Sequence, residues 1–212
     1  GGARPLARKV RSTVSGELNM ALIPLANIDD LNGTPREVAE SGQAQYGRVL
    51  NTWAAIMNKP DLFAAYLPFL RQVAGPGELD AETKDLSALL VASLNHCRYS
   101  LSHRATSASK NGVSDELMRQ VVSGEWDWLE QRLRTALELT RELTLLPPQA
   151  TYTDLPYGVD PELRARVSAQ FSAVEILELT FSISVWNALT RFHRVMGFEL
   201  DMPLPPEGVD TD

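Results

Sequence analysis

The chain has 212 residues, of which 44% are hydrophobic and 22% charged, so it is long enough for one sizeable core or two small domains. A formal net charge of −7 argues against a nucleic-acid-binding protein, which would carry a basic surface. A single cysteine excludes an internal disulfide framework. No apolar run approaches the ~20 residues that cross a bilayer, and the first residues lack an apolar secretory segment. We therefore expect a cytoplasmic protein that binds neither nucleic acid nor membranes.

The sequence divides into three parts. Residues 1–19 are basic and polar, and we interpret them as an expression scar or as an arm that contacts another subunit. Residues 20–200 carry the helical patterns and form the predicted domain. Residues 201–212 are an acidic, proline-rich tail.

An all-α fold is expected because no stretch alternates apolar and polar residues as a half-buried strand would. The capping box at Thr34–Glu37 predicts a helix that ends near Asn58-Lys59-Pro60. Asp61 then predicts a short helix that Pro68 bends or breaks.

Asp80 is the expected cap of a central helix that continues to Asn111 and stops at Gly112. Further helices are predicted after Ser114, from residue 125 to about residue 145, and after Asp160, with a loop at 147–158. The capping box Ser172–Glu175 opens a last helix that ends near Met196. Because this helix is apolar on nearly every face, we expect it to be buried.

The residues with the most chemical potential lie in the segment 94–104 of the central helix. At ~100° per residue, Cys97, Ser100 and Arg104 share one face, with His103 at its edge. A thiol, a hydroxyl, a base and a cation within two turns suit a reaction surface. The alternative is a core cysteine beside solvated polar residues, since free cysteine is among the most buried residue types.

Several segments resemble one superfamily. They are Lys84-Asp85-Leu86, the run from Leu94 to His103, Gly112–Leu117, and Trp186–Phe192 near the carboxyl end. From about residue 35 to residue 200, the sequence is similar to the carboxymuconolactone decarboxylase and alkylhydroperoxidase D superfamily. The resemblance implies an all-helical bundle that assembles as a homo-oligomer: a dimer, trimer or hexamer.

The peroxidase branch of that superfamily has an acid, a Cys-x-x-Cys pair and a histidine one turn later. Here Asp85 stands at the acid and Cys97 at the first, resolving cysteine. Ser100 replaces the second cysteine, which attacks the hydroperoxide, and Arg104 replaces the histidine, with His103 one residue early. A serine hydroxyl does not reduce a peroxide through a sulfenic acid, so Cys97 would have to act alone with external thiols.

The decarboxylase branch needs no cysteine and no cofactor. In the spacing of its motif Tyr99 and His103 fit, while Ser100 stands where glutamate is frequent. The resemblance implies that Arg104 holds a substrate carboxylate, His103 moves one proton, and an apolar pocket favours the loss of carbon dioxide. Further wall residues would come from the closing helix: Asn187, Arg191 and His193. Asn187 and His193 lie about 120° apart on a helix, so we do not expect both to point inward unless the helix is kinked.

We expect no metal and no cofactor, because three histidines and one cysteine lack the spacing of a zinc site and no phosphate-binding motif is present. Three functions remain open at this point. The first is a cofactor-free acid–base lyase acting on a small organic acid or lactone. The second is a one-cysteine hydroperoxide reductase that depends on Cys97. The third is a catalytically inactive family member that binds a ligand.

Overall fold

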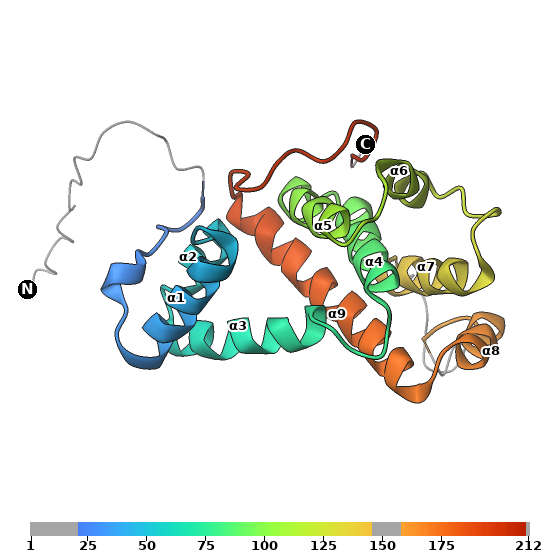
Figure 1. Cartoon of the computed structure of the whole chain (residues 1–212), viewed down its shortest axis with the longest axis horizontal. Helices are drawn as coiled ribbons and strands as arrows, with labels where there is room; N and C mark the ends of the chain where they lie inside the picture. The colour runs from blue at the N-terminus through green and yellow to red at the C-terminus, as the bar shows by residue number, and fades with distance from the viewer. Residues whose placement is uncertain (1–20, 146–157, 211–212) are drawn as a thin grey trace, which may run out of the picture.

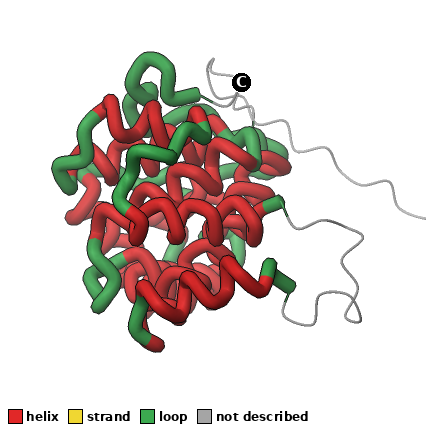
Figure 2. Tube along the Cα trace, turned by 90° about the vertical axis from the view of Figure 1, so that its right-hand side faces the viewer, coloured by secondary structure: helices red, strands yellow, loops and turns green. Residues whose placement is uncertain are grey.

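The computed structural model of the chain describes residues 21–145 and 158–210. Within these ranges the chain is made of α-helices, loops and one short 3-10 helix, without a strand (Figures 1 and 2). The predicted all-α fold is therefore confirmed. The predicted tail at 1–19 and the loop from 147 to 157 lie outside the described residues. The helical elements are η1 (Ile28–Asp30), α1 (Gly33–Tyr46), α2 (Asn51–Ile56), α3 (Pro60–Ala74), α4 (Ala81–Leu94), α5 (Arg98–Lys110), α6 (Asp115–Ser123), α7 (Gln131–Thr144), α8 (Pro161–Gln170) and α9 (Ala173–Met196).

Helix α4 is the centre of the molecule, with α5, α6, α7 and α9 packed around it (Figure 1). The Asp80 cap is confirmed, because its carboxylate accepts a hydrogen bond from the Thr83 backbone N–H at 2.7 Å. From Thr83 onward almost the whole helix is buried, including Lys84. The Lys84 ammonium donates to the Glu178 carboxylate at 3.2 Å, so its charge is partnered.

The single helix predicted from Asp80 to Asn111 is wrong, because the chain breaks between α4 and α5. His96 has a φ of 49°, in the left-handed region that side chains rarely adopt. The Asn95 amide donates to Asn187 and Thr190 of α9, each at 2.9 Å. These contacts with α9 stabilise the break, and no glycine or proline marks it in the sequence. Its consequence is that Cys97 caps the start of α5.

The amino-terminal helix also differs from its prediction. Thr34 does not cap it, because α1 begins at Gly33 after Asn32. The predicted continuation of this helix is interrupted, since α1 ends at Tyr46 and the following Gly47 has a φ of 74°. A separate short helix, α2, follows, and its first backbone N–H, that of Asn51, donates to Asp201 of the carboxyl-terminal segment.

Two other boundaries needed correction. Pro68 lies inside α3, which continues to Ala74, so the predicted short helix is extended by two turns. Helix α7 begins at Gln131 and not at residue 125. The caps predicted at Ser114, Asp160 and Ser172 are confirmed by their hydrogen bonds to backbone N–H groups.

Helix α9 crosses the molecule and contacts α3, α4, α5 and α7. Contrary to the expectation of burial on every side, one side of α9 is exposed: Leu177 is 62% and Phe181 47% accessible. Its other side packs Leu179, Ile183 and Trp186 into the core. No helix within residues 21–145 and 158–210 is long and apolar enough to cross a membrane.

Candidate active site

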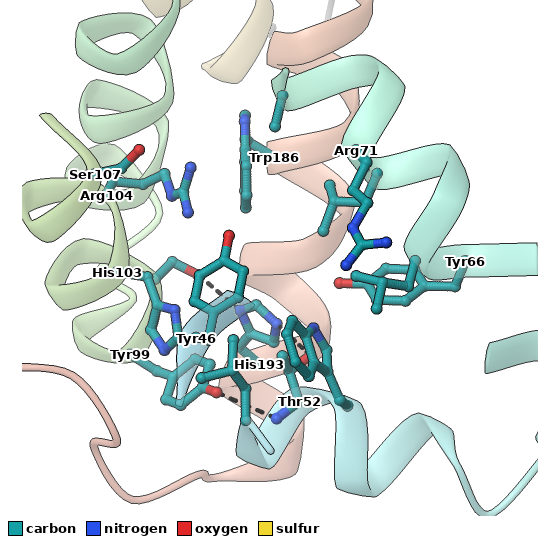
Figure 3. Close-up of a pocket in the computed structure, with 16 residues that line it drawn as sticks. Tyr46, Thr52, Tyr66, Arg71, Tyr99, His103, Arg104, Ser107, Trp186 and His193 are labelled. Carbon is teal, nitrogen blue, oxygen red and sulfur yellow. Dashed lines mark hydrogen bonds between the residues drawn. The ribbon is translucent and has the colours of Figure 1, made fainter. Parts of the chain in front are cut away.

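A cavity of about 130 Å³ lies among α1, α2, α3, α5 and α9. At roughly 30 Å³ for each water molecule, this is room for about four waters, which suits one small molecule. Figure 3 shows side chains from these helices converging on it. Its lining residues are Tyr46, Leu50, Thr52, Trp53, Tyr66, Leu67, Leu70, Arg71, Ala74, Tyr99, Ser100, His103, Arg104, Ser107, Trp186 and His193.

Four of the residues singled out from the sequence reach the cavity from α5: Tyr99, Ser100, His103 and Arg104. Their spacing of four residues brings His103 beneath Tyr99 and Arg104 beneath Ser100 on one side of the helix. The ring centroids of Tyr99 and His103 are 4.5 Å apart. A fifth, His193, reaches the same cavity from α9.

His103 is held by a carboxylate from the carboxyl-terminal segment. Its Nε2 lies 2.5 Å from Asp201 Oδ1, while the Tyr99 hydroxyl donates to Asp201 Oδ2 at 2.8 Å. The Asn51 backbone N–H, at the start of α2, donates to the same Oδ2 at 2.6 Å. A carboxylate only accepts hydrogen bonds, so His103 carries its proton on Nε2. Among the described residues no hydrogen bond occupies Nδ1, which leaves that atom to act as a base.

The charges of this pair follow from their surroundings. Burial opposes ionisation of Asp201, but the hydrogen bonds from His103, Asn51 and Tyr99 outweigh it and lower the pKa of the carboxyl group. Burial lowers the pKa of His103, and the neighbouring Asp201 only partly offsets this. Near neutral pH the pair is therefore a carboxylate and a neutral imidazole. Burial, together with the Asp201 charge, raises the pKa of Tyr99, which stays a neutral donor.

A second chain of hydrogen bonds runs from Cys97 through Ser100 and His193 to Thr52. The Cys97 thiol donates to Ser100 Oγ at 3.2 Å, and Ser100 Oγ lies 2.7 Å from His193 Nδ1. Because the hydroxyl accepts from the thiol, its own proton points to Nδ1. His193 Nε2 then donates to Thr52 Oγ1 at 3.0 Å. All four groups are thus connected in one direction, from thiol to hydroxyl to imidazole to hydroxyl.

Within the part of the chain that the structure describes, no carboxylate bonds to His193, in contrast to His103. Burial lowers the pKa of His193 to about 3, and the neighbouring His103 and Arg104 act in the same direction. His193 is therefore a neutral imidazole over the physiological pH range.

Arg104 brings a positive charge to the cavity wall. Its guanidinium stacks on the Trp186 ring, with Cζ 4.0 Å from the ring centroid. Burial lowers the pKa of this guanidinium, although the charge of Asp85 opposes the shift. Arginine stays protonated at neutral pH even so. Its Nε is buried and has no hydrogen-bond partner among the described residues.

Four of the candidate residues lie outside the cavity. Cys97 is only 2% exposed and stands behind Ser100. Asp85 accepts hydrogen bonds from Ser107 Oγ at 2.9 Å and from Asn111 Nδ2 at 2.5 Å. Asn187 is buried toward α4 and α7, and Arg191 donates to its carbonyl oxygen at 3.0 Å. Asn187 and His193 are both buried, contrary to the expectation from their angular separation, but only His193 reaches the cavity.

Asp201, the group that organises the site, is not among the residues predicted from the sequence. No local pattern could reveal it, because Asp201 lies 98 residues from His103 in a segment that reads as an acidic tail. Thr52, Arg71 and Trp186 were missed as site residues too. The described residues contain no group of three or more histidine, cysteine, aspartate or glutamate side chains that could hold a metal ion.

These features define an all-helical protein with a small cavity in which a carboxylate-bound histidine lies beside an arginine. Residues 60–142 match the model of the carboxymuconolactone decarboxylase family. This part of the chain is therefore similar to the carboxymuconolactone decarboxylase family, and the fold is that of alkylhydroperoxidase D-like proteins.

Individual relatives are distant. The uncharacterized protein YnjA of Escherichia coli (strain K12) is 27% identical over 186 residues, which cover 84% of this chain and 92% of that protein. The debrominase Bmp8, solved in complex with 2,3,4-tribromopyrrole, is 17% identical with a TM-score of 0.68 over 85% of this chain and 91% of its own. A peroxidase-related protein with an AhpD core from Ralstonia eutropha JMP134 is 15% identical, with a TM-score of 0.69 over 91% and 96%. The two structures show a shared fold.

Proposed function

We propose that the protein is a cofactor-free acid–base enzyme of the decarboxylase type, acting on a small organic acid or lactone. The observation that carries this proposal is the His103–Asp201 pair: its hydrogen bond occupies Nε2 of a histidine that lines the cavity, and Arg104 lines the same wall. One residue moves a proton and the other attracts an anion, which are the two requirements of such a reaction.

In the proposed reaction Arg104 orients the acid within the cavity. The apolar and aromatic walls disfavour a localised carboxylate charge and so favour the departure of carbon dioxide. His103, neutral at rest, first takes a proton from solvent at Nδ1, and Asp201 stabilises the resulting imidazolium. The carbon–carbon bond then breaks, and its electron pair, left on the substrate carbon, takes that proton and returns His103 to the neutral imidazole. The net change is R–CO₂⁻ + H⁺ → R–H + CO₂.

The test is carbon dioxide release from a panel of small lactone acids and keto acids, measured for the parent protein and for His103→Asn. We expect turnover of at least one acid, and a loss of about 100-fold or more in the variant. His96→Asn is the matched control, because His96 is exposed outside the cavity and asparagine tolerates its positive φ. Failure of every acid, or full activity of His103→Asn, would overturn the proposal.

A one-cysteine hydroperoxide reductase is the second candidate. The hydrogen bonds from Cys97 to Ser100 and from Ser100 to His193 support it, since they offer the thiol proton a route to a neutral imidazole. The thiolate would attack the peroxide oxygen, giving a sulfenic acid and an alcohol. Two external thiols would then reduce the sulfenic acid to thiol and water and be oxidised to their disulfide. Against it, Ser100 and not Cys97 lines the cavity.

Thiol labelling of Cys97 with and without tert-butyl hydroperoxide separates the two candidates. The acid–base proposal expects an inert thiol and a Cys97→Ser variant that keeps its decarboxylase activity. Peroxide-dependent loss of the thiol, together with turnover by external thiols, would favour the reductase.

The panel also includes 2,3,4-tribromopyrrole with an external thiol, because Bmp8 is a debrominase of the same fold. An inactive ligand-binding protein is expected to bind acids without converting any.

We also propose that the protein works in the cytoplasm, without a metal or other cofactor, as a homo-oligomer. The apolar side of α9 supports the last point: Phe181 is 47% exposed and its ring meets that of Phe69, also exposed, at a centroid distance of 6.0 Å. Light scattering of the purified protein tests it, and a monomer at micromolar concentration would contradict it.

A further inference from the structure

Two arginines, Arg71 and Arg104, line the cavity, and none of the carboxylates that the structure describes pairs with either of them. Within residues 21–145 and 158–210, neither Arg104 nor Arg71 forms an ion pair with an aspartate or glutamate. Arg71 donates only to neutral groups, Ser41 Oγ and Gln45 Oε1, each at 3.2 Å. The nearby Asp85 accepts from neutral donors and does not bond to Arg104. The cavity is thus positive, although the whole chain has a charge of −7.

Of the two arginines, Arg104 places the stronger geometric demand on a ligand. One face of its guanidinium is covered by Trp186, and its Nε is buried without a hydrogen bond from any described residue. A buried polar atom without a hydrogen-bond partner destabilises the folded protein, and a ligand that bonds to it removes that cost. A planar carboxylate is the ligand that best satisfies the edge of a guanidinium, because it accepts two parallel hydrogen bonds. Figure 3 shows Arg104 and Arg71 extending toward the same space from opposite sides.

Aromatic rings form much of the remaining wall. The sequence has four tryptophans and five tyrosines, and five of these nine residues line this one cavity: Tyr46, Trp53, Tyr66, Tyr99 and Trp186. Rings pack best against other rings, in stacked or edge-to-face contacts. Burial raises the pKa of Tyr66, so its hydroxyl stays a neutral hydrogen-bond donor near Arg104. The small volume leaves room for one ring.

We infer that the acid which this cavity binds is an aromatic carboxylate with a single ring, its carboxylate on Arg104 and its ring among the five aromatic side chains. This inference rests on the proposed function in that it names the substrate class of the same cavity. It assigns Arg104 and the aromatic wall to specificity, and leaves the proton transfer to His103.

The probes are four small molecules that separate charge from ring: benzoate, cyclohexanecarboxylate, acetate and benzyl alcohol. Binding is measured by calorimetry at pH 7 with the full chain. We expect benzoate to bind at least tenfold more tightly than acetate and benzyl alcohol, and several-fold more tightly than cyclohexanecarboxylate. In Arg104→Met the affinity for benzoate falls at least tenfold, while Arg104→Lys recovers part of it.

Arg141→Met is the matched control, because Arg141 also stacks on a tryptophan, Trp126, at 4.7 Å but does not line the cavity. Its affinity for benzoate is expected to equal that of the parent. Circular dichroism and thermal melting establish that each variant is folded. Equal affinity for benzoate and acetate would reduce the site to a general anion site, and equal affinity for benzoate and cyclohexanecarboxylate to a general apolar acid site. Either result overturns the inference, as does the absence of benzoate binding or its persistence in Arg104→Met.

The His103→Asn variant separates this inference from the proposed function. Benzoate binding by that variant, with no turnover of any acid by the parent, would remove the proposed function and leave the inference standing. Turnover of a non-aromatic acid that depends on His103, without selectivity for benzoate, would do the reverse.

Discussion

Two histidines line the same cavity, yet their partners differ. His103 bonds to a carboxylate that also accepts from Tyr99 and from the start of α2, whereas the described partners of His193 are the hydroxyls of Ser100 and Thr52. A carboxylate stabilises an imidazolium, and a hydroxyl does so only weakly. His103 can therefore gain a proton during a reaction, while His193 resists one.

Thr52 connects the hydrogen bonds around the two histidines, because it bonds to His193 and to Tyr99, which bonds to the same carboxylate as His103. Its backbone N–H donates to the Tyr99 hydroxyl at 3.2 Å, and its side chain contacts His193. Two imidazoles of equal intrinsic basicity therefore differ in how readily they accept a proton, because only one of them has a charged neighbour. The predictions below test that difference.

The largest effect is expected for Asp201→Asn. The amide keeps the shape but removes the charge that orients and stabilises the His103 imidazolium, so turnover should fall about 100-fold or more. Because Asp201 raises the pKa of His103, the pH–rate profile should also move to lower pH. Steady-state kinetics from pH 5 to pH 9 measure both effects.

The control for that change is Asp160→Asn, at the cap of α8, where asparagine caps equally well. It should leave rate and profile unchanged. A slower Asp201→Asn enzyme with an unmoved profile would mean that Asp201 acts through folding alone.

The next effect concerns stability in acid. The unfolded chain takes up a proton on residue 193 near the ordinary histidine pKa of 6.5, but the folded chain does so only near pH 3. Stability should therefore fall as the pH is lowered through this window, by about 1.4 kcal/mol per pH unit for this one group. Between pH 6.5 and pH 4.5 this amounts to roughly 3 kcal/mol.

His193→Gln removes this titration and should reduce the pH dependence of the free energy of unfolding, measured with urea at pH 7.5, 6.0 and 4.5, to the part that His103 contributes through its own lowered pKa. Asp201 does not interfere, because a carboxyl group with a lowered pKa loses its contribution only below about pH 4. An unchanged slope in the variant would show that His193 is charged in the folded protein, and the contrast between the two histidines would disappear.

The smallest effect is expected for Ser100→Ala. It leaves the Cys97 thiol and His193 Nδ1 without their shared hydroxyl but does not touch the His103–Asp201 pair. Turnover should fall about tenfold or less, with about 1 kcal/mol of stability lost. We compare kcat/KM of Ser100→Ala with that of Asp201→Asn. A larger loss in Ser100→Ala would mean that the hydrogen bonds of His193 matter more for turnover than the His103–Asp201 pair.

Much of the helical architecture was accessible from short-range patterns. The caps at Asp80, Ser114, Asp160 and Ser172 were identified from residues two or three positions away, the distance over which a side chain reaches a backbone N–H. The predictions failed where a distant contact outweighed the local pattern. The break after α4 depends on the hydrogen bonds of Asn95 to α9, and no helix-breaking residue near His96 predicts it.

The candidate site shows the same division. The sequence by itself determined which side chains α5 presents, because Tyr99, Ser100, His103 and Arg104 follow from helical spacing. Only the tertiary structure decided their chemistry: Asp201 and His193 lie 98 and 93 residues from their partners, and the aromatic wall comes from several helices. Helical periodicity acts within a few residues of the chain, whereas the protonation state of a histidine depends on whatever charge folding brings against it.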